Sequence, residues 1–140
     1  MYLPYRRIGE ENNMDINKTW NINPAESGDI MESISDEIVS YVPDELKMAT
    51  ALIFEETYMN VANHAYTGTD KPLTIEFTQD GENNKLVFVD NGMEFDPTKY
   101  NPGDCDPKQI GGHGIRLMKE LSKSIAYNRM NNKNYLEITF

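Results

Sequence analysis

The chain contains a single cysteine, Cys105, among its 140 residues, so no disulfide can form within it. A reducing compartment suits such a sequence, and we expect a cytoplasmic protein. Long hydrophobic runs are also missing, because no segment approaches the roughly 18 apolar residues of a membrane span. The first residues, MYLPYRRIGEENNMD, lack the apolar region of a signal peptide. The sequence therefore predicts neither a membrane segment nor export.

Basic residues are scarce: 13 lysines and arginines stand against 23 acidic residues, and the formal charge is −10. This excess of negative charge opposes nonspecific binding to nucleic acid or to an anionic membrane, and it would attract a partner with a basic patch. With a hydrophobic fraction of 39%, the length suits one domain with one core. We expect a flexible N-terminal extension over residues 1–16 and the folded domain over residues 17–140.

Helical patterns occur in three segments. Asn23 is a candidate N-cap with Pro24 as the first helical residue, and an apolar stripe continues that helix to about Tyr41. A second helix is predicted from about Asp44 to Tyr66, with the TGTD turn closing it. The third helix follows the GGHG motif in the stretch IRLMKELSK.

Alternating apolar residues indicate strands. One strand is expected near Lys18–Ile22, and two hairpins are expected around the turns DGENN and MNNKN. The order of elements predicts an α+β fold, a two-layer α/β sandwich in which three helices cover one face of a mostly antiparallel sheet. Between the hairpins, residues 91–112 show no period and are rich in Gly, Pro, Asp and Asn, which predicts a long functional loop or disorder.

The predicted second helix mixes polar and apolar residues on one side, in the stretch EETYMNVANHAY. At about 100° per residue, Asn60 lies about 40° from Glu56, and Asn63 lies about 20° from Glu56 in the other direction. Burying a carboxylate and two amides costs free energy unless each finds a partner. A ligand would supply that partner, hydrogen bonds to neighbouring elements are the alternative, and this motif alone leaves both open.

A second motif, DNGMEFDP, follows the third predicted strand. The Asp90 carboxylate can accept a hydrogen bond from an exocyclic amine, and Gly92 allows a flat ring to approach the backbone. An ordinary Asn-Gly turn is the alternative. A calcium loop of the EF-hand type is not favoured, because its alternating acids and closing glutamate are missing.

The third motif is the GGHG turn at residues 111–114, directly before a predicted helix. Backbone N–H groups at a helix start bind anions, and the helix dipole adds to the attraction. Lys108, Arg116 and Lys119 surround the turn in a chain that is otherwise acidic. The turn is not a P-loop, because no Gly-Lys-Ser or Gly-Lys-Thr follows it.

In this order, the motifs resemble the N, G1 and G2 boxes of the histidine-kinase-like (GHKL, Bergerat-fold) ATPases. The matching patterns are Glu56-x-x-x-Asn60-x-x-x-His64-Ala-Tyr, Asp90-x-Gly92-x-x-Phe-Asp-Pro and Gly111-Gly-x-Gly114-Ile. The resemblance runs from about residue 17 to residue 140. More narrowly, the chain looks like the short anti-sigma regulatory serine/threonine kinases of this superfamily.

The resemblance implies a role for each matched residue. Glu56 would be the general base that takes a proton from the attacking hydroxyl or water, and Asn60 would hold Mg²⁺ that bridges the phosphates. Asp90 would read the adenine amine, with Gly92 giving access to the ring. The remaining nucleotide-binding residues would be Lys108, Gly111, Gly112, His113 and Gly114, and the segment 93–110 would form the ATP lid.

The function implied by the resemblance is that of a Mg-ATP-dependent serine/threonine kinase. It would phosphorylate a small antagonist (anti-anti-sigma) protein and control a sigma factor by partner switching, without binding nucleic acid itself. A homodimer is possible, because the family commonly forms one. Ile110 stands where some of these kinases carry a basic residue, a departure that bears on phosphotransfer more than on ATP binding. The alternatives are an ATP-dependent protein-binding module without phosphotransfer and a purely structural α/β domain.

Overall fold

The computed structural model describes residues 15–24, 29–64, 72–99, 116 and 119–140. The helices are α1 (Ile30–Tyr41), α2 (Lys47–His64) and the short 3-10 helices η2 (Asp44–Leu46) and η3 (Pro97–Lys99). The strands are β1 (Ile16–Ile22), β2 (Leu73–Asp80), β3 (Asn83–Asp90), β4 (Ser124–Met130) and β5 (Lys133–Thr139). Residues 116 and 119–121 are also helical, where the third helix is predicted. None of the described helices is long and apolar enough to cross a membrane.

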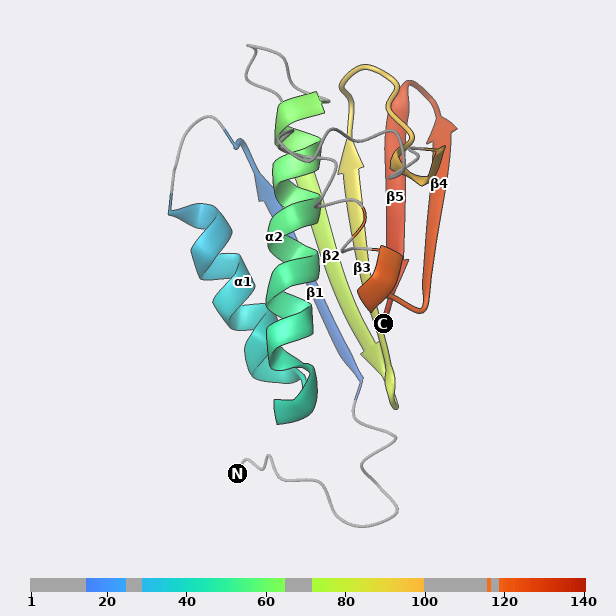
Figure 1. Ribbon diagram of the computed structural model, residues 1–140. Helices are drawn as coiled ribbons and strands as arrows, with labels where there is room; N and C mark the ends of the chain where they lie inside the picture. Colours follow the sequence, from blue (N-terminus) through green and yellow to red (C-terminus); the bar gives the residue numbers. More distant parts are fainter. Residues whose placement is uncertain (1–14, 25–28, 65–71, 100–115, 117–118) are drawn as a thin grey trace, which may run out of the picture.

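The five strands form one antiparallel sheet in the order β1-β2-β3-β5-β4. Helices α1 and α2 lie over one face of this sheet (Figure 1). Because β5 lies between β3 and β4, the chain leaves the sheet after β3, re-enters at the outer edge and returns through the interior. This arrangement confirms the predicted two-layer α+β fold.

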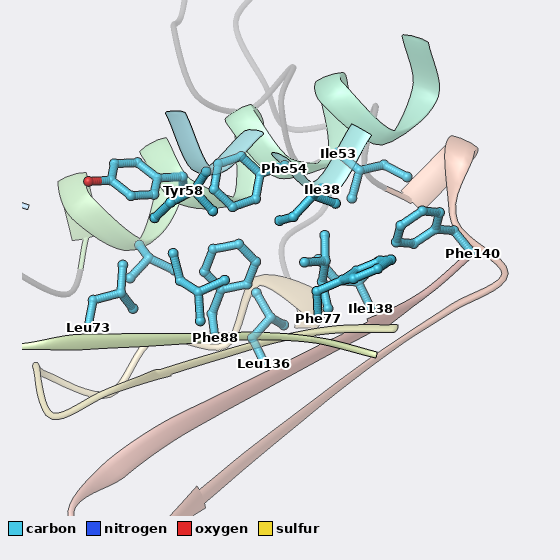
Figure 2. Packing of buried hydrophobic residues seen from close by; sticks show 14 of the residues in the cluster. Ile38, Ile53, Phe54, Tyr58, Leu73, Phe77, Phe88, Leu136, Ile138 and Phe140 are labelled. Atoms are coloured by element: carbon cyan, nitrogen blue, oxygen red, sulfur yellow. The ribbon is translucent and has the colours of Figure 1, made fainter. Parts of the chain in front are cut away.

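The core fills the space between the two helices and the sheet (Figure 2). Alternate residues of β2, β3 and β5 are buried, as the period of two predicts. From the helix layer, Ile34 and Ile38 of α1 are fully buried, and Phe54 of α2 packs against Phe88 of β3 with ring centroids 5.8 Å apart. An aromatic pair at this separation stabilises a fold by about 0.5–1.5 kcal/mol beyond the area that it buries.

Both predicted hairpins are present, and their turns use residues that tolerate positive φ. Gly81 has a φ of 63° in the β2–β3 turn, and Asn131 and Asn132 have φ values of 54° and 61° in the β4–β5 turn. Two positive values in succession are typical of a type I′ turn, whose twist matches that of the strands. With this register, Asn134 of β5 lies beside Asp90 at the end of β3.

The first helix begins later than the capping pattern predicts. Asp29 precedes the first helical residue, Ile30, so the predicted start at Pro24 with Asn23 as cap is wrong. The apolar stripe that buries the helix begins only at Ile30, and Gly28 is a poor helix former. Helices in proteins gain most of their stability from packing, so the stripe outweighs the capping pattern.

The other boundaries agree more closely with the sequence. β1 begins at Ile16, so one residue of the predicted extension 1–16 belongs to the sheet. α2 begins at Lys47, directly after η2, near the predicted start at Asp44. Residues 1–14 and the predicted end of the second helix at Tyr66 lie outside the described residues.

A polar contact joins β1 to α1 at the edge of the core, and it predicts a pH effect. The Tyr41 hydroxyl donates to Glu37 Oε2 at 2.7 Å, and Lys18 Nζ lies 3.5 Å from the same oxygen. The hydrogen bond from Tyr41, more than the charge of Lys18, holds the pKa of the Glu37 carboxyl below its ordinary value. A lowered folded-state pKa stabilises the fold above the unfolded pKa, and this stabilisation is lost as the pH falls through the folded pKa.

Tyr41→Phe should therefore raise the pKa of Glu37, which carboxyl NMR titration measures directly. The variant keeps the ring that stacks on Phe77. It should be less stable than the wild type at neutral pH, by no more than about 1 kcal/mol because the Glu37 side chain is 38% exposed, and the difference should shrink in acid. Tyr135→Phe, on the other face of the sheet, is the control. An unchanged Glu37 titration in Tyr41→Phe would contradict the assignment.

Candidate functional site

A narrow pocket lies where α2 meets the end of β3 and the β4–β5 hairpin. Its lining residues come from α2, β3, β4, β5 and the segment after β3, and they are Asn60, Val61, Asp90, Phe95, Pro97, Tyr127, Asn134 and Leu136. The pocket therefore brings together two residues that the sequence predicts as nucleotide ligands, Asn60 and Asp90, although they lie on different layers of the fold.

Asn60 is buried without a full set of hydrogen bonds. Its side chain is on the inner side of α2 and the residue is 4% exposed, yet its Nδ2 has no hydrogen-bond partner among the described residues. Leaving such a group unpaired costs about 1–3 kcal/mol. Buried polar groups in native proteins are nearly always paired, so an unpaired amide on a pocket wall indicates a ligand site.

Asp90 is equally buried, at 4% exposure, but its carboxylate is held by the protein. Oδ1 accepts hydrogen bonds from the Gly92 backbone N–H at 2.9 Å and from Asn134 Nδ2 at 2.8 Å. The bond from Gly92 closes a tight turn directly after β3, and the bond from Asn134 comes from the neighbouring strand β5. These two donors fix the orientation of the carboxylate before any ligand binds.

Glu56 lies one helical turn before Asn60 on α2 and is half-buried, but it is not among the residues that line the pocket. The pocket lining thus includes Asn60 and Asp90 but not Glu56. The predicted residues Lys108, Gly111, Gly112, His113 and Gly114 lie outside the described residues, as does the lid from residue 100 onwards.

Hydrogen bonds at η3 hold the first part of the predicted lid, which is the part that the structure describes. The Asp96 carboxylate accepts a hydrogen bond from the Thr98 backbone N–H at 2.9 Å, which caps this short helix. Lys119 Nζ donates to the Thr98 carbonyl at 3.2 Å. Arg116 instead pairs with Glu120 at 3.1 Å on the surface. Of the two cations predicted near the glycine turn in the described part, Lys119 therefore contacts the start of the lid and Arg116 forms an ion pair with Glu120.

Tyr127 and Asn134 are site residues that the sequence analysis missed. Asn134 was assigned to the turn MNNKN, whereas it belongs to β5 and is 3% exposed. A signal was present, because Asn134 shares the inward period of two with Leu136 and Ile138, and an asparagine on a core face needs a polar partner. Its proximity to Asp90 depends on the strand order, which no local pattern contains.

The side chains at the pocket include one that suits Mg²⁺. No three His, Cys, Asp or Glu side chains cluster among the residues that the structure describes. Mg²⁺ commonly takes one or two protein oxygens and completes its shell with phosphate and water, so a dedicated cage is not required. A half-turn of the Asn60 amide places its oxygen where the unpaired nitrogen lies, and the side chain therefore fits the role of one such ligand.

Comparison with known proteins agrees with this geometry. A histidine kinase-like ATPase domain matches residues 29–140, which is most of the chain. The chain belongs to the histidine kinase-like ATPase family, and the resemblance found in its motifs is confirmed. It is also similar to the serine/threonine-protein kinase BtrW of Bordetella bronchiseptica (strain ATCC BAA-588 / NCTC 13252 / RB50), with 31% identity over 99 residues, covering 67% of this chain and 70% of that protein. Family membership supports ATP binding by a kinase-like regulator.

Proposed function

We propose that the protein is a Mg-ATP-dependent serine/threonine kinase that phosphorylates a small antagonist protein and controls a sigma factor by partner switching. The observation that carries the proposal is the pocket lined by both residues: the buried amide nitrogen of Asn60 has no partner among the described residues, and the carboxylate of Asp90 is held in place. The similarity to a protein named as a serine/threonine kinase supports the reaction, and the family supports ATP as its phosphate donor.

In the proposed reaction, the residues have separate tasks. Asp90 accepts a hydrogen bond from the adenine amine and Asn60 contributes an oxygen to Mg²⁺, which when bound neutralises phosphate charge. Glu56 accepts the proton of a serine or threonine hydroxyl as that oxygen bonds to the γ-phosphorus. The bond between this phosphorus and the bridging oxygen breaks, and ADP leaves. On the basis of the motif resemblance, we assign phosphate binding to the glycine turn at residues 111–114 with Lys108, and we assign the ATP lid to the segment 93–110.

The test is a phosphotransfer assay with a partner of the expected kind. The full chain is incubated with Mg-ATP and with the antagonist protein encoded beside it, and phosphoserine or phosphothreonine is measured by mass spectrometry. We expect one phosphate on the antagonist, and none when EDTA removes Mg²⁺. Bound ATP with no phosphate transferred would favour the protein-binding module instead. A pull-down with and without ATP tests the sigma factor, which should be retained in only one of the two conditions.

A further inference from the structure

A row of three polar residues crosses the sheet, and two of them, Asn134 and Asp90, line the pocket. Arg129 of β4 pairs in register with Asn134 of β5, which in turn pairs with Asp90 of β3. Their side chains are connected, because Asn134 Nδ2 donates to Asp90 Oδ1 at 2.8 Å while Arg129 Nη1 donates to Asn134 Oδ1 at 3.0 Å. The row therefore links the edge strand β4 to the Asp90 carboxylate, which in the proposed function binds the adenine amine.

Arg129 holds the oxygen end of the Asn134 amide, while two acceptors hold its nitrogen end. An arginine can only donate hydrogen bonds, so the atom of Asn134 that faces it must be the oxygen. The amide nitrogen then faces two acceptors, Asp90 Oδ1 and the Met93 carbonyl, each at 2.8 Å. A flipped amide would oppose its oxygen to both acceptors and its NH₂ group to the guanidinium, leaving three contacts without a hydrogen bond.

Tyr127 adds a second donor to the same oxygen, since its hydroxyl bonds to Asn134 Oδ1. Partial burial raises the pKa of Tyr127, so its hydroxyl stays protonated at neutral pH. A hydroxyl can also accept a hydrogen bond, however, so Tyr127 alone would tolerate either orientation of the amide. Arg129 is the residue of the pair that permits only one.

The same Arg129 nitrogen also holds the turn that follows β3. Nη1 donates to the Gly92 carbonyl at 2.8 Å, next to the Met93 carbonyl that Asn134 holds. Both carbonyls of the turn are therefore fixed from the β4–β5 hairpin, and the Gly92 N–H is fixed by Asp90 itself. Three backbone groups of this turn, the Gly92 N–H and the Gly92 and Met93 carbonyls, are therefore held by one hydrogen-bond network.

We propose that Arg129 is a positioning residue for base recognition: it fixes the amide of Asn134, which fixes the Asp90 carboxylate to accept a hydrogen bond from the exocyclic amine of adenine. The inference rests on the proposed function, because it assumes that Asp90 reads adenine. It concerns the selectivity for the amine and not the strength of phosphate binding, which other parts of the site supply. If the network only stabilised the fold, its loss would weaken the binding of every nucleotide by the same factor.

The experiment compares two nucleotides that differ only at the base. The full chain is titrated calorimetrically with Mg-ATP and with the purine nucleoside triphosphate that carries hydrogen in place of the exocyclic amine. A hydrogen bond to a charged group gives the wild type a preference of about 10-fold to 100-fold for ATP. Arg129→Met should reduce this preference to about one tenth of its wild-type value through weaker ATP binding, with little change for the analogue.

Three further variants separate positioning from support of the fold. Tyr127→Phe should reduce the preference for ATP over the analogue by less than Arg129→Met does. Arg129→Lys should keep most of this preference, because an ammonium group, like a guanidinium, can only donate hydrogen bonds. Both keep the size of the side chain, so they remain informative if Arg129→Met fails to fold. Lys85→Met is the control, because it also removes one positive charge from the sheet, at an exposed ion pair with Glu137. It should leave the preference for ATP over the analogue unchanged.

The outcomes distinguish this inference from the proposed function. Equal weakening of both nucleotides in Arg129→Met, or an unchanged preference in that folded variant, would overturn the positioning role while ATP binding stands. A wild-type chain that binds neither nucleotide would overturn the proposed function, and the inference with it.

Discussion

Replacing Glu56 by glutamine should lower the rate of phosphotransfer by about 100-fold to 10,000-fold, the usual contribution of a general base. Glutamine keeps the shape and hydrogen-bonding reach of the side chain, but it cannot take up the hydroxyl proton. Because Glu56 does not line the pocket around Asp90, ATP affinity should stay at the wild-type value. A single-turnover assay at saturating Mg-ATP measures the chemical step, and calorimetry measures the affinity in the same preparation.

The adjacent Glu55 provides the matched control. It is also half-buried on α2, but it lies about 100° around the helix from Glu56. Glu55→Gln should therefore leave phosphotransfer near the wild-type rate. If both variants lost activity equally, the effect would come from the charge of the helix rather than from a positioned base. A fully active Glu56→Gln variant would show that another residue acts as the general base.

Asp90→Asn should weaken ATP binding by about 10-fold to 100-fold, the worth of a hydrogen bond to a charged group. The asparagine oxygen can still accept the two bonds that Oδ1 accepts from Gly92 and Asn134, so the turn after β3 is preserved. The other carboxylate oxygen becomes an NH₂ group, which opposes the adenine amine instead of accepting from it. Calorimetric titration with Mg-ATP measures the loss.

The control for this substitution makes the same chemical change at the far end of the neighbouring strand. Asp80 ends β2 at the hairpin turn and is exposed. Asp80→Asn should bind ATP as the wild type does, and thermal unfolding should show that both variants are folded. Undiminished ATP affinity in a folded Asp90→Asn would remove Asp90 from the base-reading role and would favour a site elsewhere on the chain.

The fold could be predicted because its signals are local. Hairpin turns, alternation along strands and the stripe of α1 each depend on neighbouring residues, and together they define the layers. The outer face of α2 could not be recognised, because exposed positions there carry methionine, with Met48 at 78% and Met59 at 45% exposure. Apolar residues on a solvent face hide the helical pattern that a sequence normally shows.

The candidate site was predictable only in part, and for a related reason. Asn60 and Asp90 belong to motifs that stand out as polar residues in apolar surroundings, and the structure brings them to one pocket. Asn134 lines the same pocket, and Arg129 contacts Asn134, because of the order of the strands, in which β5 lies between β3 and β4. Their contribution depends on residues far away in the sequence, so no short pattern reveals it.

The position of β5 also bears on how the protein folds. The hairpins β2–β3 and β4–β5 can each form from nearby residues, but the pairing of β3 with β5 must close the whole segment between Asp90 and Ser124. Such long-range closure is the slow kind of step in folding. Since the hydrogen bond between Asn134 and Asp90 spans this pairing, it forms only after the hairpins have docked, and it holds the carboxylate that we propose to read the base. ATP bound beside Asp90 would shift the equilibrium toward the docked state. A higher ATP concentration should therefore raise the unfolding temperature of the whole sheet.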